Sequence, residues 1–306
     1  MDLKQLKYFT RIVELESITA AAQSMFVAQP SLSQHVANLE AELGTKLLDR
    51  GPHGARPTRA GELLYNYANT ILRQVQDATV AIKLDSSSPV GRVSLGLPTS
   101  TSRMLSVELI ETLIARSPQI SVEIVEGGTS QLADMIARQR LDMAVTVDSP
   151  GSTKYDIQAL MVEQLLLVAP AAETLDGPVS LEEVSRRPLI LPAFPNSVRV
   201  KMESACNARD LQYRVVAETS AAQVMAGAAQ RGLALTVLPW SAVGDDSPGL
   251  QYVEIDDPHF YRTLFLCTSR LGTTNKACDV VSQALIELML GKVRDRQWRH
   301  ARLLSA

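Results

Sequence analysis

The segment from Ser17 to Leu43 constrains the fold of this chain more than any other, because it encodes two helices separated by a break too short for a further element. Ser17 and Thr19 each carry a side-chain oxygen that can accept a free N–H group at a helix start, and three alanines follow. Pro30 is tolerated in the first turn of a helix, so a second helix is predicted to begin beside it. Two helices joined in this way predict a helix-turn-helix unit.

The second helix has two faces of different chemistry. Apolar residues recur at helical spacing on one face, which must pack against the preceding helix; they are Leu32, Val36, Leu39 and Leu43. The other face carries short neutral donors and acceptors suited to base edges and phosphates in the major groove; they are Ser31, Ser33, Gln34 and Asn38. Periodicity alone favours two interpretations equally. One is a helix that reads DNA, and the other is an ordinary capped helical hairpin with a solvated polar face.

The segments on either side extend the pattern. Residues 3–15 form an amphipathic stretch, so the first fifty residues predict three helices around a small core. Glycine and proline interrupt residues 51–57 and predict a short two-stranded wing. Cations cluster at or near its tip, where a DNA backbone would pass; they are Arg50, His53, Arg56 and Arg59. Taken alone, this segment would be interpreted as a solvated loop.

A long helix is predicted from Thr58, which caps it, to about Leu84. One side of it is apolar over its whole length, through Leu63, Leu64, Tyr67, Ile71, Val75 and Ile82. An isolated helix cannot bury such a stripe, so it needs a partner, which is either the same helix of a second subunit or the domain that follows. The SSSP sequence at residues 86–89 predicts a hinge.

From residue 90 the pattern alternates between strand and helix, which predicts a parallel sheet with crossover helices. The clearest strands are predicted at residues 92–98, 120–127, 141–147, 163–170, 213–219, 233–239 and 265–269, and the clearest helices at 104–115, 130–138, 221–231 and 276–290. Two consecutive α/β units predict two lobes with a cleft between them. The basic tail with Trp298 is interpreted as a solvated end of the last helix, with DNA binding as the alternative.

Polar residues follow the predicted strands, where open parallel sheets bind ligands. They include Thr99 to Thr101, Gly128 to Ser130, Thr146, Asn196, Ser197, Thr219 and Ser220. Helix N-termini at this edge favour an anion such as a carboxylate. The alternative is that several of these residues are ordinary helix caps.

Composition and motifs exclude several classes of protein. The 306 residues carry a net charge of −3, and the first 85 contain nine Lys plus Arg and nine Asp plus Glu, so DNA contact must come from local groups. Cys206, Cys267 and Cys278 lack metal or disulfide spacing. Neither an HExxH, a GxSxG nor a phosphate loop is present, so no enzyme, metal or cofactor is expected. Without a signal peptide or an apolar span, a cytoplasmic protein that does not enter membranes is predicted.

The order of these parts resembles the LysR-type transcriptional regulators over essentially the full chain. The match rests on LKYFTRIVELESITAAAQSMFVAQPSLSQHVANLEAELGTKLLDR followed by PTRAGELL. Within the family, this N-terminal sequence is most similar to the nitrogen assimilation control subgroup. LDMAV, EQLLLVAP and SLEEVSRRPLILP are similar to the family's effector-domain strands. Two departures are the missing Phe in LLDR and AQRGLALTVLP in place of a glycine-richer pattern.

The resemblance implies an α/β protein with an N-terminal all-α winged helix-turn-helix domain and a two-lobed effector domain like a periplasmic binding protein. We expect the DNA-binding domain at residues 1–58, the dimerising linker helix and hinge at 59–89, and the effector domain at 90–306. Its first lobe is expected at residues 90–162 and 269–306, and its second at 163–268.

The resemblance also implies site residues. Those facing the major groove are Gln29, Pro30, Ser31, Ser33 and Gln34, and those near phosphates are Thr19, Arg50 and His53. Those near an effector between the lobes are Thr99, Ser100, Thr129, Thr146, Asn196, Ser197 and Thr219.

The leading hypothesis is a transcription regulator that reads an inverted repeat in double-stranded DNA as a homodimer or homotetramer and responds to a small anionic effector. RNA polymerase is a candidate partner. A rival hypothesis is a solute-binding module or enzyme on the two-lobed half, with the N-terminal helices serving assembly. A third is a regulator of the same type that needs no effector.

Overall fold

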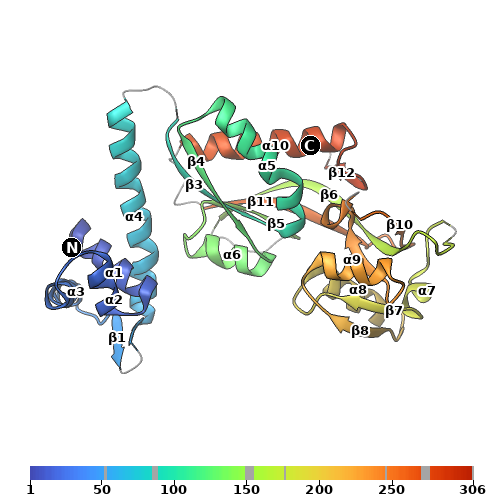
Figure 1. Ribbon diagram of the computed structural model, residues 1–306, viewed down its shortest axis with the longest axis horizontal. Helices are drawn as coiled ribbons and strands as arrows, with labels where there is room; N and C mark the ends of the chain where they lie inside the picture. Colours follow the sequence, from blue (N-terminus) through green and yellow to red (C-terminus); the bar gives the residue numbers. More distant parts are fainter. Residues whose placement is uncertain are drawn as a thin grey trace. The chain divides into compact units, whose positions relative to one another are not determined.

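The computed structural model describes residues 1–51, 54–84, 89–148, 155–175, 177–244, 247–269 and 276–304. The chain divides into two compact units, the first comprising residues 1–91 with 137–140 and the second residues 92–136 with 141–306 (Figure 1). His53 of the predicted wing and residues 86–88 of the predicted hinge lie outside the described ranges.

The first unit opens with the predicted three helices, α1 (Leu3–Leu15), α2 (Ile18–Ser24) and α3 (Gln29–Leu43). Asp2 and Gln5 form a capping box at the start of α1, and the Ser17 side chain accepts a hydrogen bond from the Ala20 N–H at the start of α2. Thr19 lies inside α2 and does not cap it. The helix-turn-helix prediction is therefore confirmed, with Ser17 as the capping residue.

The apolar stripe of α3 packs against α1 and α2, as predicted, at Leu32, Val36 and Leu39, which have no exposed surface. Leu43 is the exception and remains exposed. It is the last residue of α3, and the chain turns away from the core at Gly44, whose φ of +64° is the left-handed conformation that ends the helix.

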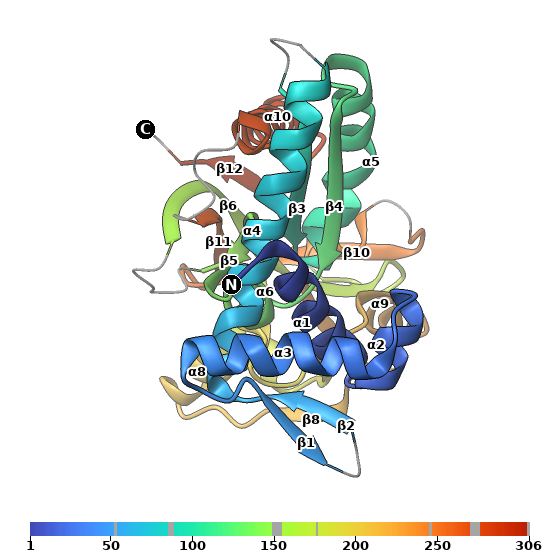
Figure 2. The ribbon, with the colours of Figure 1, turned by 90° about the vertical axis from the view of Figure 1, so that its left-hand side faces the viewer.

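The predicted wing is present as an antiparallel hairpin of β1 (Leu48–Gly51) and β2 (Gly54–Pro57). Figure 2 shows the hairpin beside α3 on one face of this unit. Thr58 caps the next helix, because its Oγ1 accepts a 3.0 Å hydrogen bond from the Gly61 N–H. That helix, α4, runs from Arg59 to Leu84 as predicted.

The second unit is built on an eight-stranded sheet in the order β10-β6-β11-β5-β3-β4, with β9 and β12 also paired to β6, and on a separate pair, β7 and β8. The strands are β3 (Gly91–Leu97), β4 (Ile120–Glu126), β5 (Met143–Val147), β6 (Tyr155–Pro170), β7 (Pro188–Leu191), β8 (Arg214–Glu218), β9 (Thr236–Pro239), β10 (Leu250–Glu254), β11 (Tyr261–Ser269) and β12 (Ala301–Leu303). The helices are α5 (Thr99–Arg116), α6 (Thr129–Ala137), α7 (Leu181–Ser185), α8 (Ser197–Asn207), α9 (Ala222–Gln230), the short η1 (Trp240–Ala242) and α10 (Lys276–Arg294).

The prediction of a purely parallel sheet is wrong. β3 pairs with β5 and β7 pairs with β8 in parallel, but β6 is antiparallel to β9, β10, β11 and β12. β6 is long because it passes through both lobes, whereas the core residues of β11 belong to the first lobe. β6 runs from the first lobe to the second and β11 runs back beside it, so the two strands have opposite directions. The alternation of strands and helices in the sequence does not reveal these directions.

Two lobes form around separate cores along β6 and β11. Leu160 and Met161 of β6 pack in the first core with α5 and α10, whereas Leu165 and Leu167 pack in the second core with α7 and α8. Leu264 and Leu266 of β11 belong to the first core, so β11 returns to the first lobe earlier than the predicted residue 269.

Local predictions fail at two places. The helix predicted from residue 104 begins at Thr99, because Pro98 is its N-cap, so Thr99 and Ser100 lie in the first turn rather than in a loop. The tail, interpreted as solvated helix, forms β12 and pairs with Met161 to Glu163 of β6.

Trp298 explains why the tail returns to the sheet. Its ring is almost completely buried in the first core, and its Nε1 donates a 2.8 Å hydrogen bond to Oε1 of Glu163. A tryptophan that both fills a core and satisfies a buried carboxylate fixes the segment around it. Within the described ranges, no helix is long and apolar enough to cross a membrane.

We expect Trp298→Ala to lower the free energy of unfolding by about 3–5 kcal/mol, because a large core side chain is lost. Trp298→Phe retains most of the packing and removes the donor to Glu163, so its cost should be about 1–3 kcal/mol. Urea unfolding of the full chain measures both, with the exposed Gln297→Ala as the matched control. A cost for Trp298→Ala no larger than that of the control would contradict this role.

Candidate DNA-binding and effector sites

The predicted major-groove residues share one solvent-facing surface at the start of α3. Gln29, Pro30, Ser31 and Gln34 are exposed and Ser33 is half-buried. The Gln29 Nε2 donates to Ser33 Oγ over 3.2 Å, and the Gln34 Nε2 donates to Asn38 Oδ1 over 2.8 Å. These contacts one turn apart limit the rotamers of both amides before any ligand arrives.

The N-terminus of α3 has free backbone donors. Its N-cap residue is Ala28, whose side chain makes no capping hydrogen bond. The first N–H groups of a helix are then open to an anion, and the helix dipole favours a phosphate there. The surface therefore combines amide and hydroxyl groups for base edges with backbone groups for the sugar-phosphate chain.

The wing is tied to α3 by Glu40, a residue that the sequence analysis missed. Glu40 Oε1 accepts hydrogen bonds of 2.8 and 3.1 Å from the N–H groups of Leu47 and Leu48, and Oε2 accepts 3.0 Å from Arg50 Nη2. Arg50 is thus paired within the protein. No spacing rule singles out Glu40, because its backbone partners lie seven and eight residues further along the chain.

The turn between α2 and α3 carries a further feature. Phe26 adopts φ +55° and is 97% exposed, shortly before α3. Thr19, predicted near a phosphate, is exposed on α2. A large apolar ring held in solvent at a left-handed position is unusual, and the described part of the chain does not cover it.

In the first lobe, the predicted effector residues meet at one sheet edge. The Gly127 N–H donates to Leu97 O over 3.2 Å, which joins the ends of β3 and β4, and the Val147 N–H donates to Thr129 Oγ1 over 3.0 Å, which joins β5. Thr99 and Ser100 lie at this edge in the first turn of α5. Thr146 does not, because it is fully buried and its Oγ1 lies 3.3 Å from Cys267 Sγ within the sheet.

In the second lobe, Asn196, Ser197 and Thr219 follow β7 and β8. The Thr219 N–H donates to Leu191 O over 3.2 Å, so the two strand ends lie together. Asn196 caps α8 through a 3.0 Å bond from the Val198 N–H, and Thr219 Oγ1 accepts from the Ala221 N–H. Asn196 is thus a helix cap, as the alternative interpretation holds, whereas Thr219 closes a turn before α9, whose N-cap is Ala221.

One ion pair brings the two edges together. Lys201 Nζ on α8 lies 3.4 Å from Oδ2 of Asp148, which follows β5. Asp148 Oδ1 also accepts a 3.2 Å bond from the Thr263 N–H. The strand ends that carry the two groups of predicted effector residues are therefore linked across the lobes.

Behind Ser100 lies a buried ion pair that the sequence analysis missed. Arg262 Nε and Nη2 contact Glu163 Oε2 at 2.8 and 2.7 Å, and both residues are buried. Arg262 Nη2 also donates to Ser100 Oγ over 2.7 Å. The hydroxyl of Ser100 is thus already engaged by an internal cation.

The same network joins the lobes. Arg262 Nη2 lies 3.3 Å from Ser241 Oγ on η1, which follows β9 of the second lobe. Arg103 on α5 of the first lobe donates from Nε to Ser241 O over 2.8 Å. We call these residues, Ser100, Arg103, Glu163, Ser241 and Arg262, the lobe joint.

The cysteines do not form a reactive site. All three are buried, and burial raises the pKa of the Cys206 and Cys267 thiols, which keeps them protonated at neutral pH. Within the described ranges, no group of three or more His, Cys, Asp or Glu side chains is arranged to hold a metal ion.

A winged helix-turn-helix joined to a two-lobed α/β domain defines a transcription regulator, and comparison with known proteins gives its family. Residues 3–62 match the bacterial regulatory helix-turn-helix protein, lysR family, and residues 86–290 match the LysR substrate binding domain. The chain belongs to the LysR family of transcriptional regulators.

Relatives match over nearly the whole chain. The nitrogen assimilation regulatory protein nac of Klebsiella aerogenes is 33% identical over 94% of this chain and 95% of its own length. Its Escherichia coli (strain K12) counterpart is 30% identical over 98% and 99%. The resemblance to the nitrogen assimilation control proteins thus extends over both units. These relatives are regulators of transcription.

Solved structures share the fold. A full-length OxyR variant from Pseudomonas aeruginosa has a TM-score of 0.74 at 23% identity, covering 93% of this chain and 94% of that one. Full-length CbnR complexed with its target DNA has a TM-score of 0.66 at 17% identity, covering 93% and 100%.

Proposed function

We propose that this LysR-type regulator reads an inverted repeat in double-stranded DNA through the exposed start of α3, as a homodimer or homotetramer, and responds to a small anionic effector held between its lobes. The observation that carries this proposal is the exposed set of Gln29, Ser31 and Gln34 beside free helix N–H groups. Because it would act on DNA, we place the protein in the cytoplasm. RNA polymerase is a candidate partner.

Base reading and backbone binding fall to different residues in this proposal. The amides of Gln29 and Gln34 have the donor and acceptor geometry that recognises adenine in the major groove. Arg50 on the wing serves phosphate, and it leaves Glu40 to do so, because the two are paired at 3.0 Å in the free protein. Thr19 and Pro30 shape the approach of the same surface.

Gln29→Ala should reduce discrimination between the target site and scrambled DNA by about 1–3 kcal/mol, because a base contact is lost. Ser33→Ala should act in the same direction. Arg50→Ala should weaken binding to every sequence and lower the slope of log K against log salt by about one. Titrations on DNA from upstream of the protein's own gene measure these effects.

Gln23→Ala, an exposed glutamine on α2, serves as the matched control for Gln29→Ala. Equal losses on target and scrambled DNA for Gln29→Ala would remove its role in base reading.

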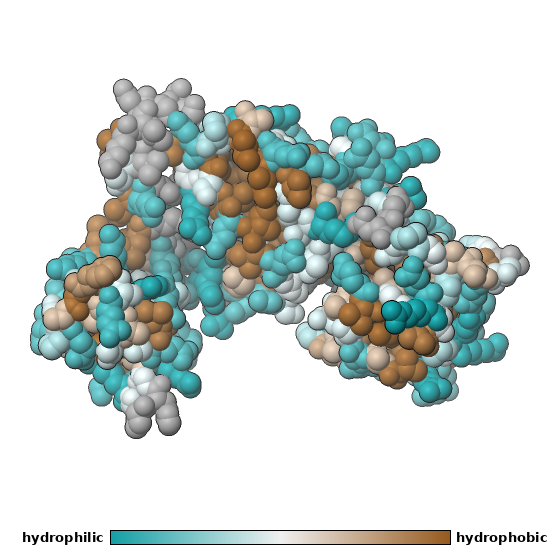
Figure 3. Space-filling model, viewed as in Figure 1, coloured by the Kyte–Doolittle hydropathy of each residue, from teal (hydrophilic) through white to brown (hydrophobic). Residues whose placement is uncertain are grey.

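Two separate apolar faces support self-assembly. Leu63 and Ile82, with Tyr67 and Val75 between them, are exposed along α4. Val107, Ile110 and Ile114 are exposed along α5, where Figure 3 shows an apolar strip. A face of this kind on a symmetric oligomer packs on its own copy, and two independent faces on one chain can join four copies.

If the wild type is a tetramer, Leu63→Glu and Ile114→Glu should each halve the molecular mass of the assembly, because each places a charge in one apolar interface. If it is a dimer, only the variant in the interface that joins the two copies should halve it. Light scattering coupled to size exclusion measures the mass. Ala115→Glu is the matched control, since Ala115 is exposed on α5 and about 100° around the helix from Ile114. A wild-type monomer, or unchanged masses for both variants, would refute the proposed assembly.

The proposed effector is anionic because the site offers positive potential without a lysine-rich coat. The N-terminus of α5 has no side-chain cap, so its first N–H groups and the helix dipole favour an anion there. Thr99 and Ser197 keep hydroxyls that make no intramolecular hydrogen bond in the described part of the chain. One such hydroxyl stands on each lobe.

Among small carboxylic acids, at least one should raise the melting temperature of the protein, since a ligand that binds only the folded state stabilises it. Thr99→Ala and Ser197→Ala should each weaken that acid by about tenfold, the loss of a charge-assisted hydrogen bond. Ser204→Ala, exposed on the same helix as Ser197, is the matched control. If no acid stabilises the protein, it is a regulator that needs no effector.

A further inference from the structure

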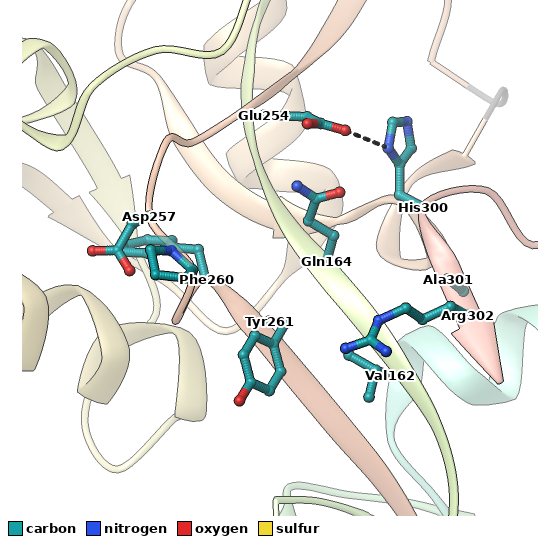
Figure 4. Close-up of a pocket in the computed structure, with 10 residues that line it drawn as sticks. Val162, Gln164, Glu254, Asp257, Phe260, Tyr261, His300, Ala301 and Arg302 are labelled. Carbon is teal, nitrogen blue, oxygen red and sulfur yellow. Dashed lines mark ion pairs between the residues drawn. The ribbon is translucent and has the colours of Figure 1, made fainter. Parts of the chain in front are cut away.

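A cavity of about 430 Å³ lies where β6, β11 and β12 meet, and none of the predicted effector residues lines it (Figure 4). Its walls include Val162 and Gln164 from β6, Tyr261 from β11, and His300 and Arg302 from the tail, and Glu254 closes one end. We call it the tail cavity. Its volume lies within the range of small-molecule pockets, which is roughly 300–1,000 Å³.

The tail cavity lies on the opposite side of β6 from the lobe joint. Successive side chains of a strand point to opposite faces, so Val162 and Gln164 face away from Glu163 between them. Glu163 contacts Arg262 and Trp298 on its own side. A molecule in the tail cavity would therefore not compete with the proposed effector.

The polar groups of the tail cavity carry opposite charges at separate places. Figure 4 shows Glu254 and His300 on one side of Gln164 and the Arg302 guanidinium on the other. Neither Arg302 nor the Gln164 amide has an intramolecular partner in the described ranges. Glu254 has only His300 Nδ1, at 4.0 Å, which is too long for a hydrogen bond.

The other carboxylate at the rim is already neutralised. Oδ2 of Asp257 lies 2.8 Å from Arg209 Nη2, and its Oδ1 accepts from the His259 N–H over 2.7 Å. Glu254 is therefore the acid available to a ligand cation, and Arg302 with Gln164 supplies the donors for a ligand anion. Val162 and Phe260 add apolar surface to the wall of the tail cavity.

We propose that the tail cavity is a second small-molecule site, which takes an α-amino acid or a similar small zwitterion. The ligand carboxylate binds Arg302 and Gln164, and its ammonium group binds Glu254. Charges of opposite sign at the two ends of a cavity of this size fit a ligand that carries both charges better than a plain acid or a plain amine.

A ligand in the tail cavity would act on the lobe joint through the tail. The Gln164 N–H donates to His300 O over 2.8 Å, so the backbone of the cavity wall is bonded to β6. Two residues before His300, Trp298 donates a hydrogen bond to Glu163. One residue before it, the Arg299 guanidinium lies 5.6 Å from the ring of Trp240, the first residue of η1. Binding that holds β12 against β6 therefore stabilises contacts of both lobes.

The test is thermal unfolding and calorimetric titration of the full chain with L-glutamine, L-serine and L-arginine, and with acetate and methylammonium as single-charge probes. At least one amino acid should raise the melting temperature, while acetate and methylammonium should not. Arg302→Gln and Glu254→Gln should each weaken that amino acid about tenfold or more. Arg296→Gln, the same change at an exposed position of the same tail, should leave its affinity unchanged.

Three results would overturn the proposal. They are no stabilisation by any of the amino acids, an equal stabilisation by acetate alone, and an affinity that Arg302→Gln leaves intact. Thr99→Ala separates this site from the proposed effector site, because it should not change binding in the tail cavity. An amino acid whose affinity falls in Thr99→Ala and not in Arg302→Gln binds between the lobes and counts against the tail cavity.

Discussion

The buried ion pair between Glu163 and Arg262 is the interaction on which the second unit depends. Two charges removed from water cost several kcal/mol each, and their attraction repays this only when further hydrogen bonds satisfy both groups. Here Trp298 satisfies the second oxygen of Glu163, and Ser100 and Ser241 share the Arg262 guanidinium. The pair therefore sets where the tail, α5 and η1 lie, and it links a predicted effector residue to both lobes.

The sequence revealed the first unit well because its structure is local. Helix spacing at Leu32, Val36 and Leu39, a cap at Ser17 and a proline at the start of α3 act over one or two turns, and all appear as predicted. Leu43 follows the same spacing but is exposed, because the chain turns at Gly44. A periodic pattern predicts which face of a helix is apolar, but it does not show where along the helix the packing against neighbouring helices ends.

The second unit shows what such patterns omit. The alternation of strands and helices does not give the direction of β6 relative to β11. That direction depends on pairing between residues about a hundred positions apart, such as Glu163 and Arg262. Basic residues around Trp298 suggest a solvated tail, and the burial of one tryptophan overrides them. Among the predicted effector residues, polar side chains gather at strand ends as expected, but Thr146 points into the sheet and Asn196 is occupied as a cap.

The discontinuous first lobe has a consequence for synthesis on the ribosome. Its core needs Val93 near the start of the second unit and Trp298 near residue 300, whereas the second core lies within residues 165–260 and the DNA-binding core within the first 65. Domains fold as their residues emerge, and distant contacts form slowly. The helix-turn-helix, with the surface proposed to bind DNA, is therefore complete while the first lobe still lacks β12, so the two units of a nascent chain finish folding at different times.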